Sequence, residues 1–188
     1  MSIIVGLGNP GEQYKLTRHN LGFLAVNALA DKLGLAWKTN KKFKAEIAAN
    51  AGLILIKPQD YMNNSGQAIS AVLSYYKLLP KKLGLLKTAN ADLSKILTVI
   101  HDDLDIELGK YKISVDSRSA GHRGVESIIS SLKTKNFQRV RIGIKTPQMR
   151  GKCGADKFVL QNFNNQEKNI IDQVIEKIIG GMLELKFK

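Results

Sequence analysis

An imidazole and a carboxylate in two distant segments are the side chains of this sequence best suited to acid–base chemistry. His19 ends a loop that follows the first apolar strand, and Asp102 comes just after another apolar strand at 96–100. Loops at the carboxyl ends of strands meet at one edge of an α/β sheet, so the two side chains can meet. A carboxylate bonded to one imidazole nitrogen fixes the tautomer and raises the basicity of the other nitrogen. The pair therefore predicts a general base, His19, that activates a water molecule.

Two asparagines are candidates for holding a substrate beside this base. The side chains of Asn9 and Asn63 each combine a hydrogen-bond donor with an acceptor, so they can orient an amide or a water. Their NH₂ groups can also stabilise a developing oxyanion. Asn63 precedes a predicted helix, so capping is an alternative role. Tyr14, Tyr61 and Met62 are expected to form an apolar wall, or else to pack in the core.

Other catalytic chemistries have weaker support. The only cysteine, Cys153, lies in a Gly-Lys-Cys-Gly loop, and no Gly-x-Ser-x-Gly elbow is present, so attack by water is favoured over a covalent intermediate. Acidic residues gather near Asp102, but no His-Glu-x-x-His motif or cysteine pair accompanies them. We therefore expect no metal and no cofactor, and we interpret Asp103, Asp105 and Glu107 as a turn after the strand.

A glycine motif near the N-terminus raises an alternative class, a nicotinamide-dependent oxidoreductase. Gly6-Leu7-Gly8-Asn9-Pro10-Gly11 fits G-x-G-x-x-G after a strand, yet a dinucleotide site also needs a helix to open at this turn. Pro10 and the absence of an apolar stripe over 12–18 argue against that helix. We interpret the glycines as a sharp turn that exposes Asn9 at the edge of the sheet.

Composition restricts the class of protein and its partners. The chain has 188 residues, 44% of them hydrophobic, and a net charge of +13. No segment approaches a membrane span, no leader is recognisable, and the single cysteine suits a reducing compartment, so a cytoplasmic location is expected. Residues 108–152 contain eleven basic and two acidic side chains. This excess favours a nucleic acid over a membrane surface, although a solvated basic surface is the alternative.

Apolar periodicity predicts the elements that must position these residues. Strands are expected at 3–7, 44–49, 53–57, 96–100, 110–115 and 140–144, and helices at 20–33, 64–78, 125–132 and 170–179. Asn64 or Ser65 is expected to cap the second helix, and 145–157 reads as a basic loop. Strands alternating with helices, together with hairpins, predict an α/β fold. We expect a single domain over 1–188 with a mixed, twisted sheet flanked by helices.

Taken together, the motifs resemble one family, the bacterial-type peptidyl-tRNA hydrolases. Their order and spacing agree over nearly the whole chain. The matching blocks are Ile4-Val5-Gly6-Leu7-Gly8-Asn9-Pro10-Gly11, Tyr14, Thr17-Arg18-His19-Asn20-Leu21-Gly22, Lys57-Pro58, Tyr61-Met62-Asn63, Ser65-Gly66, His101-Asp102-Asp103-Leu104-Asp105, Gly109, Ala120-Gly121-His122-Arg123-Gly124-Val125, Arg139-Val140-Arg141-Ile142-Gly143-Ile144 and Phe158-Val159-Leu160.

The resemblance implies a phosphorylase/hydrolase-like fold and a metal-independent hydrolysis of the ester that joins a peptide to the 3′ end of tRNA. Such an enzyme recycles tRNA from peptides dropped during translation. His19 would be the base and Asp102 its partner. Asn9 would recognise the peptide backbone, and Asn63 would position the peptide or the water.

The resemblance also implies how the tRNA is held. Tyr14 and Tyr61 match positions near the tRNA end, and Lys112 and Arg141 are plausible phosphate contacts. Met62, His122 and Arg123 complete the expected substrate-binding set. A mobile covering loop would correspond to about 145–157, and the protein is expected to be a monomer.

Two features depart from the family pattern. The family usually has Gly-His-Asn-Gly where this chain has Gly121-His122-Arg123-Gly124. Arg123 has only donors and a fixed charge, so it can clamp a phosphate or the ester carbonyl but cannot accept a proton from water. This departure leaves a noncatalytic RNA-binding protein with the same fold as an alternative. The connection at 81–94 is longer than usual, and we expect it to lie outside the site.

Overall fold

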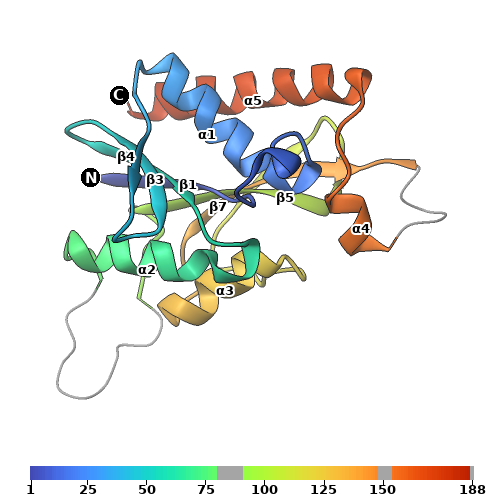
Figure 1. The fold of residues 1–188 in the computed structure, drawn as a ribbon. Coiled ribbons are helices and arrows are strands. Elements are labelled where there is room, and N and C mark those ends of the chain that lie inside the picture. Colours follow the sequence, from blue (N-terminus) through green and yellow to red (C-terminus); the bar gives the residue numbers. More distant parts are fainter. Residues whose placement is uncertain (80–90, 148–153, 187–188) are drawn as a thin grey trace.

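A seven-stranded sheet runs through the computed structural model, which describes residues 1–79, 91–147 and 154–186 (Figure 1). Its strand order is β2-β3-β4-β1-β5-β7-β6. The inner strands β4, β1, β5 and β7 pair in parallel, whereas β2, β3 and β6 pair antiparallel at the two edges, so the predicted mixed sheet is confirmed. The strands are β1 Ser2–Gly6, β2 Lys38–Asn40, β3 Ala45–Ala49, β4 Leu53–Pro58, β5 Leu97–Glu107, β6 Tyr111–Ser114 and β7 Gln138–Lys145.

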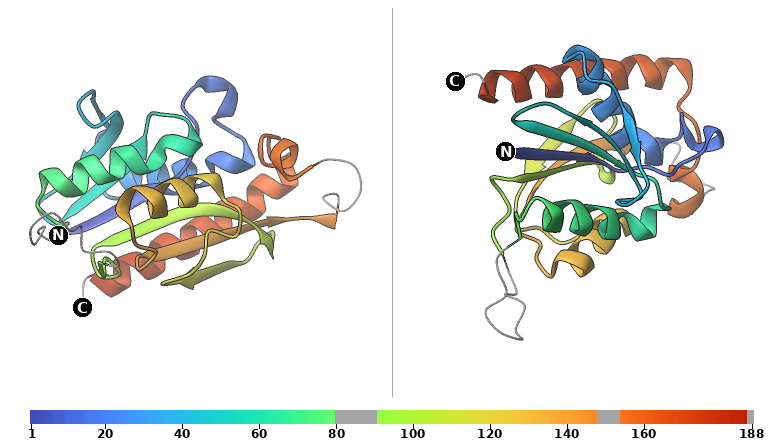
Figure 2. Two further views of the ribbon diagram at one scale, coloured as in Figure 1. Left: turned by 90° about the horizontal axis from the view of Figure 1, so that it is seen from below. Right: turned by 60° about the vertical axis from the view of Figure 1, so that its left-hand side comes forward.

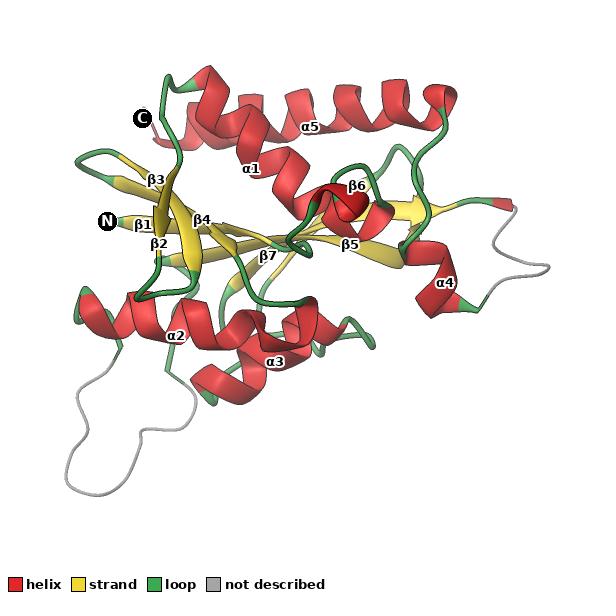
Figure 3. Cartoon of the chain, viewed as in Figure 1, coloured by secondary structure: helices red, strands yellow, loops and turns green. Residues whose placement is uncertain are grey.

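Helices cover both faces of the sheet (Figure 3). Helices α1 (Leu21–Lys32) and α5 (Asn165–Lys186) pack on one face, and α2 (Ser65–Tyr75) and α3 (Arg123–Leu132) lie side by side on the other (Figure 2). The short helix α4 (Ala155–Val159) lies at the end of the sheet where β1 and β5 finish. Two apolar cores result, one on each face of the sheet. Among the described helices, none has the length and apolar character that crossing a bilayer requires.

Alternation along β1 places its side chains in both cores. Ile3 and Val5 face α2 and α3, whereas Ile4 faces α1 and α5, and all three are buried. The first helix then begins very close to the strand ends. A Cβ atom at Gly22 would lie 2.3 Å from the backbone nitrogen of Leu7 and 2.3 Å from the backbone oxygen of Ile100. Glycine at this position therefore lets the start of α1 touch the ends of both β1 and β5.

Strand β5 extends further than predicted. The sequence suggested a strand at 96–100 followed by a turn, but β5 continues to Glu107 and pairs with β7 along this length, with an irregularity between Asp103 and Glu107. The turn interpretation of these carboxylates was therefore wrong. The partner strand β7 extends the ladder beyond the apolar run, so pairing outweighs the polar composition.

The segment predicted as a basic loop at 145–157 is partly regular. Lys145 ends β7, and Ala155–Val159 forms α4, while 148–153 lies outside the described residues. Most of the long connection at 81–94 also lies outside them. Asn64 occupies the N-cap position of α2, as predicted, but its side chain makes no capping bond, and the Ser65 hydroxyl donates to the backbone oxygen of Met62. Short 3₁₀ turns η1 (Glu12–Tyr14), η2 (Arg18–Asn20) and η3 (Met62–Asn64) precede the helices.

Candidate active site

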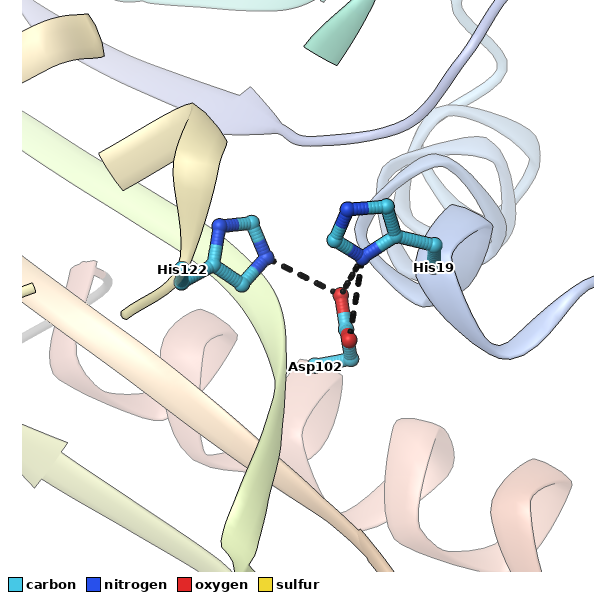
Figure 4. Close-up of side chains that lie close together, drawn as sticks. All are labelled: His19, Asp102 and His122. Carbon is cyan, nitrogen blue, oxygen red and sulfur yellow. Dashed lines mark hydrogen bonds and ion pairs between the residues drawn. The ribbon is translucent and has the colours of Figure 1, made fainter. Parts of the chain in front are cut away.

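The buried carboxylate of Asp102 lies between two imidazole rings (Figure 4). Nδ1 of His19 is 3.0 Å from Oδ1 and 3.1 Å from Oδ2 of Asp102, and Nε2 of His122 is 3.0 Å from the same Oδ1. The predicted contact between His19 and Asp102 is thus present in the structure. His122 belongs to the same cluster, and its ring centroid is 4.8 Å from that of His19.

Hydrogen bonding fixes the tautomer of His122. Its Nδ1 accepts from the backbone N–H groups of Gly124 and Val125, at 3.2 and 3.3 Å, and so caps helix α3. A neutral imidazole that accepts at Nδ1 carries its proton on Nε2, so His122 donates to Asp102. Because Asp102 as a carboxylate only accepts, His19 donates from Nδ1 and keeps a lone pair on Nε2. No residue in the described part of the chain bonds to that nitrogen.

The electrostatics of the cluster keep Asp102 ionised. Burial raises the pKa of Asp102, but the electrostatic attraction of the His19 and His122 rings and their hydrogen bonds outweigh it, so the pKa lies well below its usual range. The residue is 2% exposed, so its charge acts on the two rings with little screening by water. A permanent anion at this position stabilises the imidazolium that forms when His19 accepts a proton.

His101 supports the carboxylate from the neighbouring position on β5. Its Nδ1 donates to the backbone oxygen of Asp102 at 2.7 Å, and its ring meets the ring of His122 edge to face at 4.7 Å. Burial, followed by the electrostatic effect of the neighbouring His122 ring, lowers the pKa of His101 well below its usual value. His101 is therefore a neutral, structural partner of the Asp102 segment.

The same three side chains must also be considered as metal ligands. One ligand atom from each of His19, Asp102 and His122 lies within 4.8 Å of the others. However, His122 has no lone pair to offer, because one nitrogen accepts from the start of α3 and the other carries the proton. The next carboxylate along β5, Asp103, is 2.7 Å from Nε of Arg141. This arrangement fits proton transfer better than metal coordination.

Asn9 is held rigidly by its neighbours. Asn20 bonds to both backbone groups of Asn9, accepting from its N–H and donating to its carbonyl oxygen, each at 2.9 Å. The side-chain oxygen of Asn9 accepts from the backbone N–H of Met62 at 2.8 Å. The side-chain oxygen of Asn9 is therefore occupied, and its NH₂ group is left for a ligand. Asn9 can offer a ligand a hydrogen-bond donor but not the acceptor that the sequence also suggested.

A pocket of about 410 Å³ opens beside these residues. Eight of the predicted site residues line it, namely Asn9, His19, Tyr61, Met62, Asn63, Asp102, His122 and Arg123. Asn63 and Tyr61 are exposed, whereas Met62 is 4% exposed and packs beneath them. The opposite wall comes from α4 and the residue after it, through Asp156, Val159 and Leu160. The pocket therefore combines polar groups near His19 with an apolar wall.

Three predicted binding residues lie outside the pocket lining. Tyr14 is half-buried in η1, and Lys112 is exposed on the edge strand β6. Arg141 lies opposite Lys112 in the pairing of β6 with β7, and it holds Asp103, which does line the pocket. The two cations thus continue from the rim of the pocket toward the edge of the sheet.

Arg123 makes a contact that the sequence did not reveal. Its Nη2 is 2.7 Å from Oδ2 of Asp156, and the two side chains are 66% and 77% exposed. The pair joins the start of α3 to α4 at the pocket, so Arg123 does not touch the Asp102 cluster. Asp156 was missed because its segment reads as a loop. Asn20 was missed as a functional residue, although its place directly after His19 was a usable signal.

Comparisons with known proteins agree with this geometry. A family model described as peptidyl-tRNA hydrolase matches residues 3–186. The peptidyl-tRNA hydrolase of Mycobacterium tuberculosis is 40% identical over 179 residues, which span 93% of this chain and 85% of that protein. That of Mycolicibacterium gilvum is 37% identical over the same length. The crystal structure of peptidyl-tRNA hydrolase from Acinetobacter baumannii superposes with a TM-score of 0.81 at 32% identity, covering 96% of this chain and 85% of that one.

Proposed function

Because the chain belongs to the peptidyl-tRNA hydrolase family, we propose that it hydrolyses peptidyl-tRNA with His19 as the general base. One observation carries the assignment of the base. Nδ1 of His19 is held by the buried Asp102, which leaves Nε2 as a lone pair on a residue that lines the pocket. Both features are what a base for water requires.

The reaction divides into two proton transfers. In the first, Nε2 of His19 takes a proton from a water molecule as its oxygen attacks the carbonyl carbon of the ester. The imidazolium is stabilised by Asp102, whose carboxylate stays ionised. In the second, the bond between the carbonyl carbon and the ribose oxygen breaks, and Nε2–H of His19 gives its proton to that leaving oxygen. The products are a free peptide carboxylic acid and a tRNA with its terminal hydroxyl restored.

The two asparagines are proposed to bind the carbonyl side of the substrate. Asn9 offers its NH₂ group, because its oxygen is engaged with Met62. No described residue bonds to the Asn63 amide, so that side chain has both a donor and an acceptor for the peptide or the water. Donors placed at a developing oxyanion are among the strongest contributions to ester hydrolysis.

The tRNA is proposed to run from the pocket across the edge of the sheet. Arg123 lies at the pocket, and Arg141 and Lys112 follow side by side on β7 and β6. Tyr61, which is 58% exposed at the pocket, suits stacking against the terminal base. Tyr14 lies outside the lining and is proposed to contact the tRNA near its end, outside the pocket.

The test is the release of peptide from peptidyl-tRNA by the purified chain and by the His19→Ala variant. We expect turnover by the first and none above background by the second, with tRNA binding and folding retained by both. A chain that binds tRNA but releases no peptide would instead be the noncatalytic RNA-binding protein. Full turnover by His19→Ala would refute the role of the base while leaving the activity in place.

Three further properties are part of the proposal. The chain is proposed to fold as one domain over 1–188, since one sheet and its two cores contain elements from both ends of the chain. It is proposed to act as a monomer in the cytoplasm, where its substrate is produced. Light scattering at working concentration tests the monomeric state, and fractionation of cells tests the cytoplasmic location.

A further inference from the structure

Arg18, the residue before the proposed base, is buried and charged. It is 5% exposed, and its Nη2 lies 2.8 and 2.7 Å from the two carboxylate oxygens of Glu167. Its Nη1 donates to the backbone oxygens of Gln161 and Asn162, at 3.2 and 2.7 Å. One guanidinium therefore binds two backbone oxygens of the segment that connects α4 to α5 and both carboxylate oxygens of a residue in the first turn of α5.

Aromatic rings enclose the same guanidinium. Its central carbon lies 4.5 Å from the ring centroid of Phe158 and 5.1 Å from that of Phe163. Glu167 is itself fixed, because its Oε2 accepts from the backbone N–H of Asn164 and its own N–H donates to Asn164 Oδ1, both at 2.9 Å. The Glu167 carboxylate is thus held in place at the start of α5. It cannot shift to keep its bonds if the side chain at position 18 changes.

Backbone contacts join the same two segments. The N–H of Arg18 donates to the backbone oxygen of Gln161 at 3.0 Å, and Thr17 forms a β-bridge with Asn162. On one side of this junction is His19. On the other side are Val159 and Leu160, which line the pocket opposite His19. The junction therefore connects the proposed base to the facing wall of the pocket.

We propose that Arg18 is a positioning residue for hydrolysis, which sets the distance between His19 and the pocket wall formed by α4. The inference rests on the proposed function. Arginine suits the role because its planar guanidinium pairs with a carboxylate through two bonds and stacks on aromatic rings, whereas lysine does neither. Fixing a base against a bound ester is the kind of placement on which rate depends steeply.

Stability alone does not account for this arrangement. A buried ion pair contributes little net stability compared with apolar residues of similar volume, although removing one partner is strongly destabilising. The double variant Arg18→Met/Glu167→Met would therefore preserve folding without restoring the bonds that hold the segment. This difference separates a structural role from a positioning role.

The first experiment measures kcat, tRNA affinity and Tm for Arg18→Lys. We expect kcat to fall by about tenfold or more, with the affinity for uncharged tRNA unchanged, since Arg18 is buried and lies outside the pocket lining. The matched control is Lys57→Met. Lys57 also pairs with a carboxylate, Glu46, and stacks on Trp37, but it lies outside the pocket lining. Its loss is expected to lower Tm and leave kcat unchanged.

The second experiment compares Arg18→Met with the double variant Arg18→Met/Glu167→Met. We expect the second substitution to recover most of the lost Tm, because no unpaired charge stays buried, although the bond from Asn164 N–H to Glu167 is lost as well. We expect kcat to stay low. Recovery of kcat together with Tm would overturn the inference, as would wild-type kcat in Arg18→Lys. Failure of the unmodified chain to release peptide would overturn the proposed function as well, so the two failures are distinguishable.

Discussion

Nδ1 of His19 and Oδ1 of Asp102 lie 3.0 Å apart, although 83 positions separate the two residues in the chain. Parallel pairing of β1 with β5 brings Gly6 opposite Ile100 at the ends of the two strands. The close approach permitted by Gly22 then places the start of α1, and His19 before it, over the same strand ends. The proposed catalytic pair thus depends on one strand pairing and one helix contact.

Asp102→Asn is expected to lower kcat/KM by about 10²–10⁴-fold, the usual contribution of a general base. An asparagine NH₂ group facing Nδ1 of His19 would turn that nitrogen into an acceptor and place the proton on Nε2. The ring would then have no lone pair for water. Steady-state hydrolysis of peptidyl-tRNA checks this, and circular dichroism checks that the fold persists. A loss smaller than threefold would show that the tautomer of His19 does not depend on Asp102.

Two substitutions of His122 should separate its two hydrogen bonds. His122→Ala removes the cap of α3, which costs about 1 kcal/mol of unfolding free energy, and also the bond to Asp102. His122→Asn restores a capping oxygen but is too short to reach Asp102. We expect the alanine variant to lose stability and activity, and the asparagine variant to recover stability while kcat stays about tenfold low. Wild-type kcat in His122→Asn would mean that the bond to Asp102 contributes nothing to the rate.

Buried His101 should make folding sensitive to mild acid. Its pKa in the folded chain lies well below the unfolded value of 6.5, so below pH 6.5 the unfolded chain binds a proton that the folded chain does not. The stability contributed by neutral His101 is therefore present above pH 6.5 and is lost as the pH falls, by up to about 1.4 kcal/mol per pH unit. Urea unfolding at pH 7 and 5.5 should show a smaller decline for His101→Asn, whose NH₂ group can still reach the Asp102 carbonyl. Equal declines would place the acid sensitivity elsewhere.

Opposite effects are expected from the two members of the Arg123–Asp156 pair. Both side chains are mostly exposed, so breaking the pair should leave Tm nearly unchanged. Arg123→Gln should raise KM by removing a cation at the pocket, whereas Asp156→Asn should lower KM by freeing Arg123 and removing an anion. Kinetics at two salt concentrations would measure both. A rise in KM in both variants would show that the pair itself, and not free Arg123, serves the substrate.

Lys112 provides a test of the proposed tRNA path. If it neutralises one phosphate, Lys112→Gln should reduce the slope of log affinity against log salt by about 0.7 for a single strand or about 0.9 for a duplex. Filter binding of uncharged tRNA over a range of salt concentrations gives this slope. Lys38, exposed on β2 at the opposite edge of the sheet, is the matched control, and Lys38→Gln should leave the slope unchanged. An unchanged slope for Lys112→Gln would remove β6 from the path.

The parts of the site that follow from strand order could be predicted from the sequence. Apolar runs identified β1 and the start of β5, and the meeting of loops at the ends of parallel strands placed His19 near Asp102. The hydrogen bonds that occupy particular side-chain atoms could not be predicted. Nothing in the composition indicates that Met62 occupies the oxygen of Asn9, since this contact joins segments 53 positions apart.

Helix α4 and the full length of β5 escaped prediction for a related reason. Ala155–Val159 is only five residues long, too short for an apolar period to be visible. In β5, the polar run around Asp102 is typical of a turn, but the adjacent strand β7 supplies hydrogen bonds that keep it extended. Tertiary partners decide such segments, so the acidic wall residue Asp156 and the buried position of Asp103 became visible only in the folded chain.

The alternation of side chains along β5 has a consequence for changes in chain length. Ile100 faces α1 and α5, whereas Val99 faces α2 and α3, so successive positions of the strand belong to opposite cores. Leu93 is buried and donates its N–H to the backbone oxygen of Asn136, which anchors the chain just ahead of the strand. A change of chain length in the connection just before Leu93 is therefore expected to leave the register of β5 unchanged. The deletion of one residue between Leu93 and Asp102 would instead turn the carboxylate away from His19, even in a chain that still forms the sheet.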